Sequence, residues 1–134
     1  MWHELSSVQT TAAGEITAEV RVPAESPWFS GHFPGDPILP GIAQLGIVYD
    51  ALCRSRGQRP GVAGFSRVKF RRIIRPADRL KMTIAPRKGV AGSYTFRIAA
   101  GEEIACSGAI ALRASNDPVA QRQDASIPIK EQEP

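Results

Sequence analysis

The sequence predicts an α+β domain in which one antiparallel sheet packs around a single buried helix. Residues 41–56 carry apolar side chains at helical spacing, whereas the chain from residue 62 to residue 114 alternates between polar and apolar residues as strands do. The chain has 134 residues, of which 43% are apolar and 22% charged, and this suits one domain with one hydrophobic core.

The predicted strands lie on both sides of the helix in the chain. Residues 15–22, EITAEVRV, alternate as a strand with one buried face requires. After the helix the alternation returns together with β-branched and aromatic residues, interrupted by turn-like breaks, in segments 62–72, 78–88, 92–100 and 102–114. We interpret these segments as an antiparallel meander, and expect one helix with five or six strands.

The predicted helix is apolar on nearly every side and should therefore be buried. Its larger apolar residues recur at helical spacing, and small or apolar residues fill the other faces: Ile42, Leu45, Val48, Tyr49 and Leu52. It should end near Arg56 and Gly57, because basic residues suit the C-terminal dipole and glycine suits a left-handed cap. Pro60 prevents its continuation.

Prolines and glycines precede the helix, and we expect a long ordered loop there without regular structure until about Gly41. Each proline fixes φ and removes a backbone donor. The residues concerned are Pro23, Pro27, Gly31, Pro34, Gly35, Pro37 and Pro40.

We expect residues 1–113 to form the single domain and residues 114–134 to form a mobile polar tail, because the tail contains prolines and no sustained period. A short strand over residues 126–130, SIPIK, is an alternative for part of it. No window approaches the ~20 apolar residues of a membrane span, and the N-terminus lacks the order of a signal peptide. A cytoplasmic location is therefore expected.

The two cysteines, Cys53 and Cys106, lie far apart and belong to no paired Cys/His pattern. We interpret both as buried thiols. The sequence accordingly suggests neither a metal site nor a cofactor.

The formal net charge of +4 comes largely from one basic stretch of the chain, which could attract an acidic protein or form a solvated arginine-rich face. Nucleic acid is disfavoured because no recognition motif accompanies the charge. The residues are Arg54, Arg56, Arg59, Arg67, Lys69, Arg71, Arg72, Arg75, Arg79 and Lys81.

The candidate chemistry lies where the loop meets the helix. A neutral imidazole at His32, held near the helix start, can accept a proton at physiological pH, whereas His3 suggests only a structural or solvated role. The N–H of Gly41 would be an unpaired helix donor open to a ligand carbonyl. Together, this imidazole and this N–H group suit removal of a proton from the carbon next to a thioester carbonyl. The alternative is that the glycines and prolines only shape the loop and His32 bonds to backbone.

The loop motif then resembles a known family. Residues 31–45, GHFPGDPILPGIAQL, resemble the signature of the FabA/FabZ-type 3-hydroxyacyl-acyl-carrier-protein dehydratases, and residues 62–82 are similar to the strand pair that follows their helix. The sequence that begins at Trp28 is most similar to the ApeI-like branch of the family, which is linked to aryl polyene lipid synthesis. The resemblance covers residues 15–113 and implies a hotdog fold, an antiparallel sheet wrapped around one long central helix.

The resemblance also implies catalytic roles for individual residues. In the family, the histidine matching His32 handles the C2 proton, and the N–H matching Gly41 polarises the thioester carbonyl. The second catalytic group, a helix Glu or Asp, aligns with Gly46, so the sequence departs from the family there. Asp50, one turn further on the same face, could act through water, or could instead pair with an arginine, which we favour.

The implied substrate is a 3-hydroxyacyl thioester on an acyl carrier protein or CoA, in fatty-acid or polyene-type lipid synthesis. A homodimer is expected, with a larger oligomer or a heterodimer as alternatives. An acyl thioesterase and a non-catalytic acyl-binding or heterodimer subunit, suggested by Gly46, remain alternatives. The expected substrate-binding residues are Phe33, Pro40, Ile42, Leu45, Gly46, Gly64 and Phe65.

Overall fold

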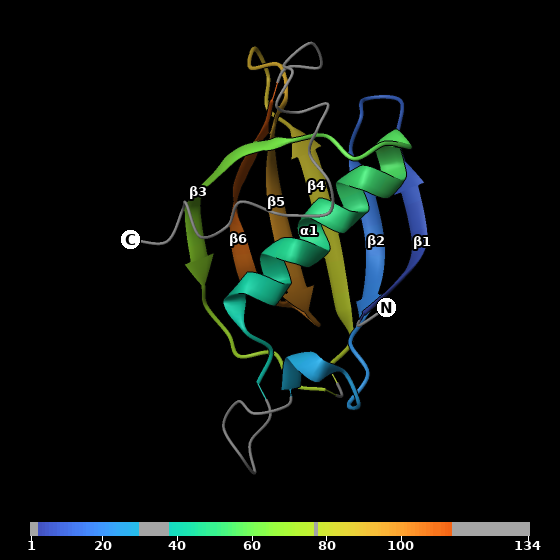
Figure 1. Cartoon of the computed structure of the whole chain (residues 1–134), viewed down its shortest axis with the longest axis vertical. Coiled ribbons are helices and arrows are strands. Elements are labelled where there is room, and N and C mark those ends of the chain that lie inside the picture. Colours follow the sequence, from blue (N-terminus) through green and yellow to red (C-terminus); the bar gives the residue numbers. More distant parts are fainter. Residues whose placement is uncertain (1–2, 30–37, 77, 114–134) are drawn as a thin grey trace.

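The computed structural model describes residues 3–29, 38–76 and 78–113. Six strands form one antiparallel sheet in the order β1-β2-β4-β5-β6-β3, and one helix crosses its inner face (Figure 1). The elements are β1 (Glu4–Thr10), β2 (Ile16–Arg21), the 3₁₀ helix η1 (Pro27–Phe29), α1 (Gly41–Arg56), β3 (Val62–Phe70), β4 (Leu80–Pro86), β5 (Ser93–Ala100) and β6 (Glu103–Leu112). The predicted α+β class, with a sheet around one helix, is confirmed.

The ends of α1 lie where the sequence places them. The helix begins after Pro40 and ends at Arg56, and Gly57 follows in the left-handed region at φ 71°. Its N–H donates to the carbonyl of Cys53 at 2.8 Å, which closes the last turn. Glycine adopts this conformation without the steric cost that a side chain would add.

The helix is buried on most of its surface, as predicted, but one stripe remains accessible. Ile47, Val48, Ala51 and Leu52 are fully buried against the sheet. Ile42, by contrast, is 43% exposed, and the positions four and eight residues later on the same face, 46 and 50, are half-buried.

The predicted meander is wrong for its first strand. β4, β5 and β6 are consecutive neighbours, but β3 pairs with β6 at the far edge of the sheet. β2 takes the place beside β4, with Ile16 opposite Ile84 and Val20 opposite Leu80. Alternation shows that a segment has one buried face but carries no information about which strand lies beside it.

The sequence interpretation also missed β1, the other edge strand. A register shift between Ser6 and Gln9, with Ser7 at φ 53°, interrupts its alternation and hides the strand pattern. The expectation of no regular structure before Gly41 is wrong as well, because η1 forms one 3₁₀ turn that buries Phe29.

The core fills the space between α1 and the inner face of the sheet. Phe65 and Phe96 meet edge to face at 6.3 Å between ring centroids. Gly108 faces Phe96 across the sheet, and a Cβ there would lie 2.8 Å from the ring, so glycine is needed for this packing. Cys53 and Cys106 are buried free thiols, as predicted, and burial raises the pKa of Cys106 to about 12.

The predicted tail over residues 114–134, and the alternative strand at 126–130, lie outside the described residues. Within the described ranges, no helix is long and apolar enough to cross a membrane.

Candidate active site

The start of α1 exposes backbone donors. Pro40 adopts an extended conformation, and its carbonyl accepts the N–H groups of Ala43 at 3.1 Å and Gln44 at 3.3 Å. No side chain caps this end, so the N–H of Gly41 has no acceptor among the described residues. These donors and the positive end of the helix dipole are available to a partial negative charge on a ligand.

A hollow of about 400 Å³ opens beside this helix start, and we call it the helix-start hollow. The ring of Phe70 packs directly on Gly41, because a Cβ at position 41 would lie 2.6 Å from its Cζ. Glycine therefore allows β3 to approach the first turn of the helix. The lining residues are Ile38, Leu39, Gly41, Gln44, Phe70, Arg71, Arg72 and Ile73.

Gln44 is a polar residue of this hollow that the sequence interpretation missed. It is only 3% exposed, and its Nε2 donates to the carbonyl of Leu39 at 3.3 Å. Leu39 in turn donates its N–H to the carbonyl of Ile74 at 2.8 Å. The Oε1 of Gln44 is buried without a hydrogen-bond partner among the described residues. The sequence signal that could have identified Gln44 is that it is the one polar side chain in an otherwise apolar first turn of the helix.

Asp50 is held by two basic side chains. Its Oδ2 accepts from His3 Nε2 at 2.8 Å and lies 3.3 Å from Arg54 Nη2. The His3 hydrogen bond lowers the pKa of Asp50 most, burial opposes this, and Arg54 lowers it further. The arginine pairing that we favoured is confirmed, and His3 has a structural role. Asp50 is not among the residues that line the helix-start hollow.

The remaining predicted site residues are distributed over two elements. Pro40, Ile42, Leu45 and Gly46 lie at the start or in the first turns of α1, where Leu45 is buried and Ile42 exposed. Gly64 and Phe65 lie on β3, outside the lining of the helix-start hollow. His32 and Phe33 lie outside the described residues.

Several members of the predicted basic cluster are engaged by neighbours within the chain. Arg54 contacts Asp50, Arg56 donates to the hydroxyl of Tyr94 at 3.0 Å, and Arg59 lies 5.6 Å from the ring centre of Tyr49. Arg72 pairs with Asp78 and Glu103. Neighbours within the chain thus neutralise or shield part of the predicted charge.

A long helix wrapped by one antiparallel sheet is the arrangement of the hotdog class of proteins. A family model described as ApeI-like, ApeI dehydratase, matches residues 8–109. The chain therefore belongs to the FabA/FabZ-like dehydratase family, in its ApeI-like branch.

Two curated relatives are 3-hydroxyacyl-[acyl-carrier-protein] dehydratases FabZ. The one from Alkaliphilus metalliredigens is 35% identical over 105 residues, covering 71% of each chain. The one from Oenococcus oeni is 32% identical over 110 residues, covering 75% of this chain and 78% of the relative. Among solved structures, the dehydratase heterocomplex ApeI:P from Xenorhabdus doucetiae matches with TM-score 0.75 and 25% identity, over 85% of this chain and all of the other.

The pairing of Asp50 with His3 and Arg54 predicts how the stability of the fold changes at acid pH. Because folding depresses this carboxyl pKa, its contribution to stability is complete above the unfolded value of about 3.9 and is lost as pH falls through the lower folded value. Asp50→Asn should reduce the free energy of unfolding at pH 7 by roughly 1–3 kcal/mol and should flatten the loss of stability below about pH 4.

Urea unfolding midpoints at a series of pH values measure this effect. Glu4→Gln is the matched control, since Glu4 is exposed and lies 3.8 Å from Arg21. An acid limb of the same steepness in wild type and Asp50→Asn would contradict the assignment.

Proposed function

We propose that this protein dehydrates 3-hydroxyacyl thioesters carried by an acyl carrier protein, giving the 2-enoyl thioester and water. The observation that carries the proposal is the uncapped helix start at Gly41, which directly follows the family's histidine loop. Membership of a dehydratase family, and curated relatives named for this reaction, support it. The proposal includes a cytoplasmic location.

In the proposed mechanism the residues act on two neighbouring carbons. The thioester carbonyl accepts the Gly41 N–H, so that negative charge developing on its oxygen during C2 deprotonation is stabilised. His32 removes the C2 proton. The C2=C3 double bond forms as the C3–O bond breaks, and the hydroxyl group leaves with a proton as water.

The site lacks the family's helix carboxylate as the donor of that proton. Gly46 offers no side chain where the family has a carboxylate, and Asp50 is already bound by His3 and Arg54. An ionised and paired Asp50 is a poor general acid, so we propose that it contributes at most through water. This arrangement favours a second candidate function, in which the chain is a non-catalytic acyl-binding or heterodimer subunit.

For the substrate we propose that the acyl chain runs along the exposed stripe of α1. The sequence-derived contacts Phe33, Pro40, Ile42, Leu45, Gly46, Gly64 and Phe65 belong to this proposal. Gln44 is added to them, because its unpartnered Oε1 beside Gly41 could accept a hydrogen bond from a hydroxyl or amide of the bound thioester. Arg71 lines the same hollow and provides positive charge toward an acidic carrier, whereas the charge of Arg72 is already balanced by Asp78 and Glu103.

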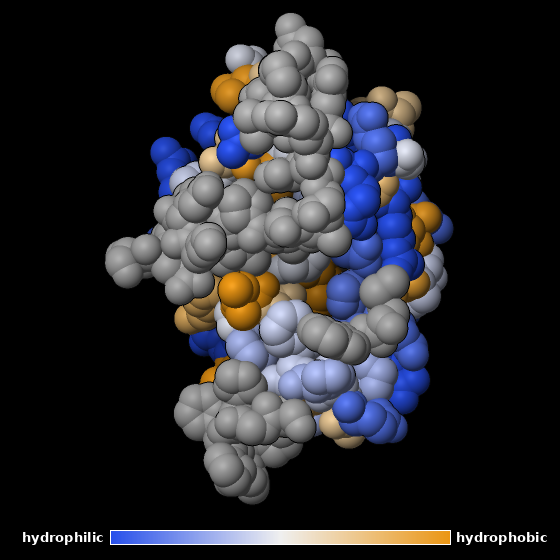
Figure 2. Space-filling model, in the orientation of Figure 1, coloured by the Kyte–Doolittle hydropathy of each residue, from blue (hydrophilic) through white to orange (hydrophobic). Residues whose placement is uncertain are grey.

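We further propose that a second copy, or a homologous partner, covers the surface around the helix-start hollow. Ile42, Phe70 and Ile73 are 43%, 52% and 45% exposed and come from α1, β3 and the segment that follows β3. Apolar surface is visible near the start of α1, whereas the flank of β1 and β2 is mainly hydrophilic (Figure 2). Among the described strands, β3 pairs only with β6, so a partner strand could pair with its other edge.

His32→Ala tests the proposed base. The variant should lose dehydration of a 3-hydroxyacyl carrier thioester, and hydration in the reverse direction, by about a hundredfold to ten-thousandfold, because the C2 proton has no acceptor. Enoyl product is followed by mass spectrometry, and thermal melting checks the fold. Wild-type rates in a folded His32→Ala protein would remove this residue from the mechanism.

Gly46→Glu tests the missing acid. Wild type should turn over slowly, because the loss of a positioned acid costs on the order of 10²–10⁴ in rate, and Gly46→Glu should raise kcat if the pocket accepts the side chain. Asp50→Asn is assayed alongside it, with unfolding midpoints to detect destabilisation by a buried carboxylate. Robust wild-type turnover that survives Asp50→Asn and gains nothing from Gly46→Glu would defeat the missing-acid argument.

Ile73→Asp tests the partner surface. Wild type should be a dimer in light scattering at micromolar concentration, and Ile73→Asp should weaken association at least about tenfold, because it places a charge in an apolar contact. Val90→Asp is the control, since Val90 is also 45% exposed but lies in the turn between β4 and β5. A monomeric wild type, or equal effects of both changes, would count against this surface.

A further inference from the structure

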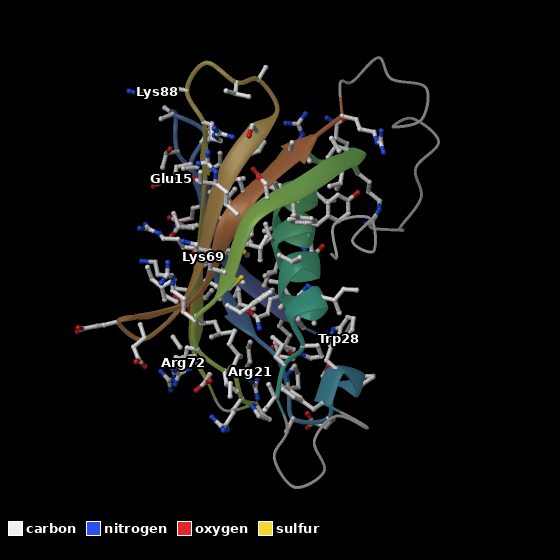
Figure 3. The ribbon with its side chains drawn as sticks, turned by 90° about the vertical axis from the view of Figure 1, so that its left-hand side faces the viewer. Glu15, Arg21, Trp28, Lys69, Arg72 and Lys88 are labelled. Atoms are coloured by element: carbon white, nitrogen blue, oxygen red, sulfur yellow. The ribbon has the colours of Figure 1, made fainter. Side chains whose placement is uncertain are left out.

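The face of the sheet opposite α1 carries a second hollow, of about 450 Å³, which we call the outer hollow. The labelled side chains of Lys69 and Glu15 lie on this face, away from the helix (Figure 3). Apart from Phe96, the residues of its floor on β4, β5 and β6 are mainly small or hydroxyl-bearing, and most of its long side chains are basic. The lining residues are Glu15, Arg67, Lys69, Arg71, Thr83, Ala85, Arg87, Thr95, Phe96, Arg97, Ser107, Gly108 and Ala109.

The charges of the outer hollow are not compensated within the described chain. Five cationic side chains, Arg67, Lys69, Arg71, Arg87 and Arg97, line it against the single carboxylate of Glu15. None of the five has a carboxylate within the 4.0 Å of an ion pair among the described residues.

Some arginines elsewhere on the described surface do have acidic neighbours, whereas Arg56 and Arg59 contact tyrosines. Arg54 contacts Asp50, and Arg72 contacts both Asp78 and Glu103. Like charges gathered on one face repel each other and do not stabilise the fold. A negatively charged ligand would relieve this repulsion.

The strand register aligns donors across the floor. Lys69 of β3 is opposite Ser107 of β6, Ser107 is opposite Arg97 of β5, and Arg97 is opposite Thr83 of β4. Since neighbouring strands lie about 4.8 Å apart, the Cα atoms of Lys69 and Arg97 are separated by about 10 Å with Ser107 between them. An anion above Ser107 is within reach of both long cationic side chains.

A bulge in β3 adds Arg67 to this row. Ser66 pairs with Ala109 and Lys69 with Ser107, so β3 contains one more residue than β6 between these pairs. Arg67 takes up the irregularity at φ 54°, in the left-handed region where glycine is favoured. The chain thus has an arginine at a position whose backbone conformation is unfavourable for residues other than glycine. This arginine lines the outer hollow.

We propose that the outer hollow binds a small ligand that carries two or more phosphate groups. Arginine forks with hydroxyl donors suit phosphate oxygens, and five cations exceed what one phosphate can neutralise. The volume is that of a small-molecule site.

An acidic protein is the less favoured occupant. None of the exposed large apolar residues of the described chain lines the outer hollow, and a protein interface of ordinary size needs such anchors at its centre.

The test is isothermal titration of the full-length protein with sodium tripolyphosphate at low ionic strength. One saturable site per chain is expected, with orthophosphate at least about tenfold weaker. Arg97→Ala should weaken tripolyphosphate binding about tenfold or more, because it removes a charge-assisted contact. Arg21→Ala is the control: it removes the same charge from an exposed arginine paired with Glu4, outside the outer hollow, and should change affinity less than about twofold.

Arg67→Gly separates binding from folding. It keeps the bulge, so its melting temperature should be unchanged or higher, while tripolyphosphate binding weakens about tenfold. Ser7→Gly, at φ 53° on β1, relieves a similar backbone conformation without removing charge and should bind like wild type.

Three results would overturn the proposal. The first is no saturable binding of tripolyphosphate to wild type. The second is equal weakening in Arg21→Ala and Arg97→Ala, which would mean a general charge effect. The third is Arg97-dependent binding of an acidic carrier protein without binding of tripolyphosphate, which would assign the surface to a protein partner. The assay contains no acyl substrate, so its outcome is independent of dehydratase activity.

Discussion

The packing of α1 against one face of a six-stranded sheet is the constraint on which the rest of the structure depends. The helix is apolar on most of its surface, and burying it requires inward side chains from every strand between the two edges. This packing fixes the position of the helix start, where Phe70 rests on Gly41. The position of the proposed thioester contact therefore depends on the core behind it.

The same packing divides the polar groups between two environments. On the helix side, the described carboxylate of Asp50 is engaged by His3 and Arg54. A carboxylate near a core is stable only with such partners, and these partners make it less able to deliver a proton. On the other side of the sheet, water can solvate unpaired cations, so Arg67, Lys69 and Arg97 could accumulate there without a cost in buried charge.

Much of the fold could be predicted from local signals. Helical spacing, Pro40 and Gly57 were sufficient for the helix and both of its ends. The position of β3 beside β6 was not predictable, because strand neighbours are chosen by contacts between segments distant in sequence. The irregularity at Ser7 breaks the alternation of β1, so the sequence pattern did not reveal this strand. The irregularity at Arg67 likewise hid the outward position of that side chain. Of the candidate site, the place of Gly41 at the start of the helix was predictable from Pro40, whereas the buried position of Gln44 depends on its hydrogen bond to the carbonyl of Leu39.

The sequence by itself determined the class of this protein: a helix that must be buried, strands with one apolar face, and a loop motif whose residue types suit acyl-thioester chemistry. Those properties are local, since they follow from backbone preferences and from the periodicity of side chains. The tertiary structure alone decided which charges are neutralised. Asp50 meets His3 across 47 positions of the chain, while cations of β3 line the same hollow as Arg97 of β5, and none of them has a carboxylate within ion-pair distance among the described residues. Coulomb interactions depend on distance in space, and only the folded chain sets those distances.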